Sequence, residues 1–267
     1  MKTVIQVYDR LRQKVQFLYT QLKLDRHEKF KGRKLAVSIV DTLTLSLFKH
    51  KNHIATKKSV YEIFNLDCSY KTLVVNMNRF AKLAGIMLAF MLNLNRKNPH
   101  PLKHTDSTDI PVSTIRKASS HKTMRSLAAW GKTGKGWFYG LKMHITTDFS
   151  RRVLSIRFTT GNTDDRKIFI RLNKGLFGVF VADAAYVSQK LQQEFYVEHQ
   201  RILFAQPRKN MKKLITGFQN LLYGTRMIIE LNFRKLKLFY GLVTSMPRSV
   251  NGYLANYIYS LLAYQLA

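Results

Sequence analysis

Acidic residues and cysteines are scarce in this sequence. The 267 residues include 15 Asp and Glu against 45 Lys and Arg, which leaves a formal net charge of +30, and the only cysteine is Cys68. One thiol excludes an internal disulfide and a structural zinc site built on cysteines. The apolar stretches at residues 83–94 and at the C-terminus fall short of the roughly 18 uninterrupted apolar residues of a membrane span, so we expect no transmembrane helix.

The excess of positive charge indicates a polyanionic partner. Apolar residues make up 46% of the chain, which is enough for a core and excludes a disordered basic tail. Since each phosphate that a basic protein contacts releases counterions, nucleic acid is the first candidate and an anionic membrane surface is the second. The N-terminus has charges every few residues and lacks the apolar region of a secretory signal. Together with the lone thiol, this predicts a reducing, cytoplasmic location.

The chain changes character near residue 100. Residues 1–100 repeat apolar side chains at helical spacing and predict an all-helical domain. The sequence Asn98-Pro99-His100-Pro101 interrupts this pattern, because closely spaced prolines break a helix. We therefore place a boundary here and expect a second domain at residues 101–267.

The second domain is predicted to alternate strands with helices. Short apolar runs between turn residues predict five strands, at residues 102–112, 137–147, 153–160, 176–183 and 201–206. Helices are expected between the third and fourth strands, between the fourth and fifth, at about 221–240, and after Ser249. This order is typical of an α/β domain with a mixed sheet in which at least the later strands are parallel.

Because carboxylates are few, each can be weighed as a site residue. Most lie among Lys and Arg on predicted polar faces or at helix starts, where ion pairing or favourable helix dipoles explain them. Asp183 ends an apolar strand, where open α/β sheets place their ligand sites. Asp106 lies in the first strand of the same domain, and Asp109 competes with it for an active role.

Glu230 falls inside the helix predicted at 221–240. Tyr223, Arg226, Glu230 and Lys237 stand at offsets of 0, 3, 7 and 14, and at about 100° per residue they share one sector of a helix. Such a stripe is also typical of a solvated salt-bridge face. Three carboxylates brought together can hold two divalent cations about 4 Å apart, which activate the attacking oxygen and stabilise the leaving oxygen of a phosphodiester.

From Asp106 onward the sequence resembles the DDE-type transposases of bacterial insertion sequences. The four residues from Tyr223 to Lys237 match the Tyr-x2-Arg-x3-Glu-x6-Lys signature of one group of these enzymes. Further matching segments are DSTDIPVS, GKTGKGWFYGLKMH, TTGNTDDR, ADAAYVS and RKNMK. The family's usual Asp-Lys-Gly-Tyr or Asp-Ser-Gly-Tyr is Asp183-Ala184-Ala185-Tyr186 here.

The resemblance implies an α/β catalytic domain with a ribonuclease H-like mixed sheet flanked by helices, preceded by the helical N-terminal domain. It implies that Asp106, Asp183 and Glu230 hold two Mg²⁺ ions, with Mn²⁺ as a substitute, and that Asp109 is a neighbour rather than a ligand.

The same resemblance implies roles for basic residues around the carboxylates. Tyr223, Arg226 and Lys237 would support the helix of Glu230 and contact DNA. We also expect phosphate contacts from a basic cluster that lies between a strand and that helix. Its members are Arg208, Lys209, Lys212 and Lys213. The segment 114–135 carries six further basic residues and is predicted to be a loop, either in contact with DNA or solvated.

The implied activity is transposition. The N-terminal domain would recognise terminal inverted repeats, through two helices joined near Asp67-Cys68-Ser69 that form either a helix-turn-helix or a plain helical hairpin. The catalytic domain would cut DNA and transfer its 3′-hydroxyl ends to target DNA, in at least a dimer, at the nucleoid of a bacterial cell. Two alternatives stay open: a metal-dependent DNA nuclease of the same fold without strand transfer, or a catalytically decayed DNA-binding relative.

Overall fold

The chain is divided into two compact units. The computed structural model describes residues 3–27, 34–134, 136–207, 211 and 214–267. One unit consists of Met1–Met91 and Lys235–Ala267, and the other consists of Leu92–Arg234. This division differs from the boundary expected at residue 100, because residues 235–267 group with the N-terminal helices. We call the two units the helical unit and the sheet unit.

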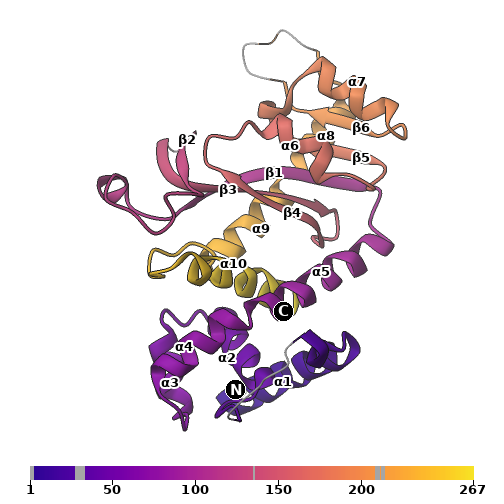
Figure 1. Cartoon of the computed structure of the whole chain (residues 1–267). Helices are drawn as coiled ribbons and strands as arrows, with labels where there is room; N and C mark the ends of the chain where they lie inside the picture. The colour runs from indigo at the N-terminus through magenta and orange to yellow at the C-terminus, as the bar shows by residue number, and fades with distance from the viewer. Residues whose placement is uncertain (1–2, 28–33, 135, 208–210, 212–213) are drawn as a thin grey trace. The chain divides into compact units, whose positions relative to one another are not determined.

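The helical unit confirms that the N-terminal region is helical (Figure 1). Its elements are α1 (Val4–Gln21), the 3₁₀ helix η1 (Leu24–His27), α2 (Ile39–Lys51), α3 (Lys57–Phe64), α4 (Tyr70–Arg79), the first part of α5 (Ala81–Lys97), the end of α9 (Met227–Leu238) and α10 (Val250–Gln265).

Capping residues define where several of these helices begin. Thr3 caps α1 in a reciprocal capping box with Gln6, and Ser38, Ser69 and Ser249 cap α2, α4 and α10. Each hydroxyl accepts a hydrogen bond from a backbone amide that has no partner inside its helix. The caps therefore fix the helix starts locally, before any packing.

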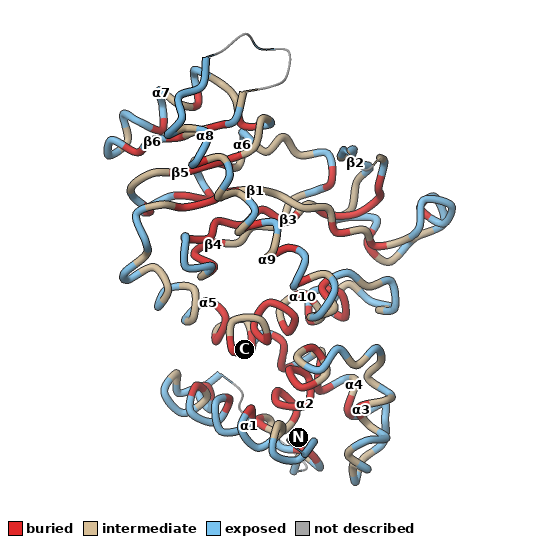
Figure 2. The backbone as a smooth tube through the Cα atoms, turned by 180° about the vertical axis from the view of Figure 1, so that it is seen from behind, coloured by how far each residue is buried: buried red, intermediate tan, exposed pale blue. Residues whose placement is uncertain are grey.

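Helix α2 forms the centre of the helical unit. Its residues from 42 to 48 are all buried, as the red tube in Figure 2 shows. The C-terminal segment is tied to the N-terminal helices by direct hydrogen bonds. The Tyr259 hydroxyl donates to the Met77 carbonyl at 2.8 Å, and Lys14 Nζ donates to the Leu266 carbonyl at 2.8 Å. Residues far apart in the sequence thus complete one core.

The sheet unit is built on a six-stranded mixed sheet. Its strands are β1 (Leu102–Pro111), β2 (Ala129–Thr133), β3 (Gly136–Asp148), β4 (Val153–Thr160), β5 (Val179–Ala182) and β6 (Ile202–Ala205). The order is β2-β3-β1-β5-β6, and β4 also pairs with β3. The helices α6 (Asp165–Leu172), α7 (Gln189–Val197) and α8 (Gly217–Gly224) and the start of α9 complete the unit.

The strand directions confirm the expected mixed sheet. β1 is antiparallel to β3 and parallel to β5, which is parallel to β6. All five predicted strands are present. The prediction omitted β2, which is short and contains a glycine, Gly131, and it treated these residues as part of a loop.

The pairing of β1 with β5 brings two aspartates to one edge. The last paired residues are Thr105 and Ala182, so Asp106 and Asp183 are the next residues of neighbouring parallel strands. Parallel strands leave their carboxyl ends at the same edge of a sheet, which is where such folds place ligand sites.

A polar network lies inside the sheet unit, below that edge. Thr146 Oγ1 donates to Asn173 Oδ1 at 2.5 Å, and Asn173 Nδ2 donates to the Phe169 carbonyl at 3.0 Å. The hydroxyls of Thr105 and Thr146 are 2.9 Å apart. Asn173 is fully buried, and its hydrogen bonds tie α6 to β1 and β3.

The continuous helix predicted at 221–240 was wrong. Helix α8 ends at Gly224 and α9 begins at Met227, with Thr225 and Arg226 between them. The Thr225 hydroxyl donates to the Leu222 carbonyl at 2.6 Å, and the amides of Thr225 and Arg226 bond three residues back instead of four. Glycine and a hydroxyl that competes for backbone carbonyls both weaken a helix. Tyr223 therefore does not share a helix with Glu230.

One stretch, Tyr70–Lys97, is long and apolar enough to cross a membrane by length and composition alone, contrary to our expectation from the apolar run lengths. Half of its most apolar window is buried inside the protein, and the stretch is divided into α4 and α5 at Phe80. Core helices pass the same test, so this single stretch is weak support for a membrane span.

Candidate active site

Asp106 and Asp183 are each oriented by the amide of the next residue. Asp106 Oδ1 accepts a hydrogen bond from the Ser107 amide at 2.7 Å, and Asp183 Oδ1 accepts one from the Ala184 amide at 2.6 Å. Strand β1 therefore presents Asp106 from within the sheet, while Asp183 stands at the end of β5. The amide that orients Asp106 belongs to β1, and the amide that orients Asp183 belongs to the turn that follows β5.

Arg226 lies among three carboxylates. Its guanidinium is 3.6 Å from Asp106 Oδ2, 3.2 Å from Asp183 Oδ1 and 3.7 Å from Glu230 Oε1. The break between α8 and α9 puts Arg226 at the turn, and Glu230 follows one helical turn later. The structure thus brings the three predicted carboxylates around one cation, from three different elements.

The three carboxylates differ in their exposure to solvent. The side chain of Asp106 is 17% exposed, against 45% for Asp183 and 62% for Glu230. Burial raises the pKa of Asp106 to about 7, and the nearby negative charges of Asp183 and Asp165 act in the same direction. The Ser107 amide and Arg226 oppose this rise. A positive charge among these groups is therefore favourable.

The donor set fits divalent cations. Carboxylate oxygens are the ligands that Mg²⁺ and Mn²⁺ prefer, and Asp106, Asp183 and Glu230 already surround a cationic group. Within the described part of the chain, no group of three His, Cys, Asp or Glu side chains is close enough to form a ready-made metal site. Arg226 occupies the place between these oxygens, so metal binding would require the guanidinium to move away.

Alanine is accommodated where the related transposases have glycine. Asp183 caps a short 3₁₀ turn, η3 (Ala184–Tyr186), by accepting from the Ala184 amide. Ala184 and Ala185 are not among the described residues with positive φ. Since a positive φ is what strains the backbone of a residue other than glycine, the sequence Asp183-Ala184-Ala185-Tyr186 forms this turn without such strain.

The sequence reasoning missed Asp165, which it assigned only to a helix start. Asp165 is the first residue of α6, and its Oδ1 is 3.2 Å from Lys142 Nζ and 3.6 Å from His144 Nδ1. Its charge also acts on Asp106 and on the buried hydroxyl of Tyr186. The position of Asp165 near Asp106 depends on tertiary structure, so helical or strand spacing could not predict it. Its place in the segment TTGNTDDR was the one feature of the sequence that pointed to a role at the site.

Two other predicted residues, Asp109 and Tyr223, have their own places on the sheet. Asp109 pairs in register with Lys142, whereas Asp106 pairs with Ile145. Because the two aspartates are three residues apart on one strand, their side chains lie on opposite faces of the sheet. Tyr223 donates its hydroxyl to the Ala205 carbonyl at 3.2 Å and so supports the strand next to β5.

The remaining predicted basic residues cannot be placed at the site. Lys237 belongs to α9 and to the helical unit. Four others lie outside the described residues, namely Arg208, Lys209, Lys212 and Lys213.

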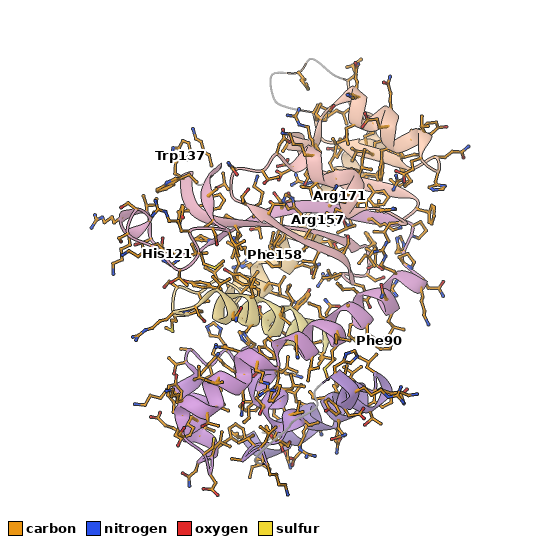
Figure 3. The ribbon with its side chains drawn as sticks, in the orientation of Figure 1. Phe90, His121, Trp137, Arg157, Phe158 and Arg171 are labelled. Carbon is orange, nitrogen blue, oxygen red and sulfur yellow. The ribbon has the colours of Figure 1, made fainter. Side chains whose placement is uncertain are left out.

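The β2–β3 hairpin exposes aromatic and basic side chains. Lys132 Nζ is 5.6 Å from the ring centroid of Trp137, and Trp137 and Trp130 are 57% and 43% exposed. Figure 3 shows Trp137 on this hairpin, pointing away from the sheet. The basic segment predicted as a loop thus ends in a strand with aromatic neighbours.

Comparisons with known proteins identify the family. The model of the family described as Transposase DDE domain matches residues 96–250, which is more than half of the chain. A search of curated proteins found no match.

Two solved structures were also compared. The cryo-EM structure of a piggyBac transposase synaptic complex with hairpin DNA has a TM-score of 0.53 and 8% identity, and it covers 94% of this chain and 69% of that chain. The crystal structure of the Mos1 mariner paired end complex with Mn has 10% identity and covers 88% of this chain and 92% of that chain. Its TM-score of 0.26 is too low to show a shared fold. The fold, expected to be ribonuclease H-like, is thereby confirmed. The chain belongs to the transposase DDE domain family.

Proposed function

We propose that this transposase cuts DNA at the ends of an insertion sequence and joins the freed 3′-hydroxyl ends to target DNA. One observation carries the proposal: Asp106, Asp183 and Glu230, from three separate elements, all lie within 4 Å of the Arg226 guanidinium. In a family defined by acidic residues, this is the carboxylate group suited to phosphodiester chemistry.

We propose that these three residues hold two divalent cations, Mg²⁺ or Mn²⁺. When bound, such ions activate an attacking oxygen and stabilise the leaving oxygen of a phosphodiester. The backbone amides of Ser107 and Ala184 would keep the aspartates oriented. Arg226, displaced from the carboxylates, would be free to pair with a DNA phosphate, since a guanidinium binds phosphate as readily as carboxylate.

The DNA partner is supported by charge. The net charge of +30 favours binding along the phosphate backbone. Terminal inverted repeats and target DNA are the two substrates that this function requires, and two ends brought together imply at least a dimer. We place the protein at the nucleoid of a bacterial cell. Tyr223, Lys237 and the basic cluster at Arg208, Lys209, Lys212 and Lys213 are proposed as supporting DNA contacts.

The test uses the full chain and the DNA that flanks its gene. A labelled fragment carrying both flanking inverted repeats is incubated with a supercoiled target plasmid and Mg²⁺ or Mn²⁺. We expect cuts at the ends and covalent joining to the plasmid. Asp183→Asn should lower both by at least about 100-fold, because it weakens metal binding.

Asp109→Asn is the matched control, because it removes the same charge from the opposite face of the same sheet. It should cut and join like the wild type. Cleavage that survives Asp183→Asn would contradict the proposed site. Cleavage without any joined product would instead favour a nuclease, and binding without cleavage would favour a decayed relative.

A further inference from the structure

A cavity of about 730 Å³ opens within the helical unit. Its walls come from the end of α2, the start of α3, one face of α4 and the segment that leads into α10. Pockets for small organic ligands are roughly 300–1,000 Å³, so this cavity has the size of a ligand site. The carboxylate group described above belongs to the sheet unit and has no part in it.

The cavity has positive charge and no carboxylate. Among the described lining residues, five are Lys or Arg and none is Asp or Glu; the five are Lys49, Lys57, Lys58, Lys71 and Arg248. Lys58 Nζ lies 3.7 Å from Glu62 Oε1, and Glu62 is on the exposed side of α3 and does not line the cavity. Lys57 Nζ donates to a neutral amide, Asn78 Oδ1, at 2.7 Å.

The charged form of two of these lysines is disfavoured. Burial lowers the pKa of Lys57 to about 8, and the charge of Lys49 lowers it further. Burial also lowers the pKa of Lys49. Two partly desolvated ammonium groups that face one cavity cost stability, unless an anion neutralises them.

Two helix starts add to the positive potential. Thr56 caps α3 and Ser249 caps α10, and both residues line the cavity. The amino end of a helix carries a partial positive charge and attracts anions. The positive ends of these dipoles add to the positive charge of the lysines. Phosphate is the anion that best matches this combination of helix starts and lysines.

The remaining wall is apolar and aromatic. Tyr70, Val75 and Met246 line the cavity although they are 41%, 54% and 63% exposed, and Val74 and Tyr259 lie beside them. Exposed apolar side chains next to a cationic site match a ligand with a flat ring and a phosphate. A nucleotide has both parts.

We propose that this cavity binds one unpaired nucleotide of a DNA strand, with its phosphate at Lys49 and Lys57 and its base against Tyr70. The choice of DNA as the source rests on the proposed function. In an intact duplex each base is stacked and paired inside the helix while its phosphate lies outside. Only an unpaired nucleotide can therefore present its base and its phosphate to one cavity together.

The test measures binding and contact without metal, so that no cutting occurs. The full chain in EDTA is mixed with a short single strand that carries one 5-iododeoxyuridine, irradiated, digested and mapped by mass spectrometry. We expect a cross-link at Tyr70. Fluorescence anisotropy should show that Lys57→Gln weakens single-strand binding about tenfold, which is the loss of one partly buried ion pair with phosphate.

Lys34→Gln provides the matched control, because Lys34 is an exposed lysine of the same unit that does not line the cavity. Lys57→Arg should restore binding, and Tyr70→Ala should remove the cross-link without unfolding the exposed start of α4. Equal weakening by Lys57→Gln and Lys34→Gln, or cross-links that avoid Tyr70, would overturn the proposal. An unlabelled DNA strand should protect Tyr70 from cross-linking better than thymidine monophosphate at the same concentration. Equal protection by the two would overturn the assignment to a DNA strand in favour of a free nucleotide.

These outcomes are independent of the carboxylate site. Asp183→Asn should cross-link like the wild type and cut DNA at least about 100-fold less. A Tyr70 cross-link in a protein that never cuts DNA would leave the cavity assignment standing and remove the proposed function, whereas cutting without the cross-link would do the reverse.

Discussion

Nη1 of Arg226 lies 3.2 Å from Oδ1 of Asp183, and the same guanidinium reaches Asp106 and Glu230. One cation thus balances three carboxylates, of which Asp106 is the most buried. The metal ions proposed for this site would compete with Arg226 for the same oxygens.

Arg226→Gln should lower the free energy of unfolding by about 1–3 kcal/mol in EDTA, because it leaves a partly buried carboxylate without its charged partner. Mn²⁺ should then stabilise the variant more than the wild type, since no guanidinium competes for the oxygens. Urea unfolding with and without Mn²⁺ measures both effects. Arg234→Gln, an exposed arginine of the same helix, should show neither. Equal responses of wild type and Arg226→Gln to Mn²⁺ would refute the competition.

Ala185→Gly restores the residue that related transposases usually have, and we expect no gain in activity from it. The turn after Asp183 has no positive φ, so glycine would only add freedom to the unfolded chain and cost about 0.5–1 kcal/mol. Thermal unfolding and the end-cleavage assay measure the two effects. A clear rise in cleavage would show that the alanines restrict the site.

His50 should make the protein sensitive to acid. Burial lowers the pKa of His50 to about 3, and its Nδ1 is 2.8 Å from the Tyr240 carbonyl. Between pH 6.5 and about 3 the unfolded chain binds a proton that the folded protein does not, so stability falls as the pH falls. From pH 7 to pH 5 this single group should cost about 2 kcal/mol.

Urea unfolding of His50→Gln at pH 7 and pH 5 tests this dependence. The variant should be less stable than the wild type at pH 7 and should lose about 2 kcal/mol less on acidification. His27→Gln changes an exposed histidine of the same unit and should keep the wild-type slope. If His50→Gln keeps that slope too, His50 is not the responsible group.

Asn173→Ala should destabilise the sheet unit by about 1–3 kcal/mol, because it removes the acceptor of the buried Thr146 hydroxyl and one of the two donors to the Phe169 carbonyl. Asn162→Ala removes an exposed amide whose Oδ1 accepts from the Thr160 hydroxyl, and should cost less than about 0.5 kcal/mol. Chemical denaturation of the two variants gives the comparison. A small cost at Asn173 would mean that water replaces its side chain.

Local pattern was sufficient for much of the sheet unit. Alternation and turn residues predicted the strands that carry Asp106 and Asp183, and the caps Ser188 and Ser249 start α7 and α10 as expected. The break before Glu230 was missed, because it depends on the Thr225 hydroxyl turning back to the Leu222 carbonyl. Helical spacing alone cannot show such a competition.

Tertiary proximity explains the other failures. Asp165 has the local features of a helix start, and only the folded sheet brings it near Asp106. Lys49 and Lys57 resemble any other lysines in a basic chain, until the fold lines a cavity with both. The grouping of residues 235–267 with the N-terminal helices likewise requires contacts between distant segments.

The helical unit is interrupted by the whole sheet unit, which has a consequence during synthesis. Helices α1 to α4 are translated before the sheet unit, and their partner α10 is translated after it. At 5–20 residues per second, the N-terminal helices wait on the order of 10 s for the C-terminal segment that completes their core. This segment contributes the hydrogen bonds that involve Tyr259 and Leu266. A chain that stops before α10 would leave these helices without the partner that completes their core.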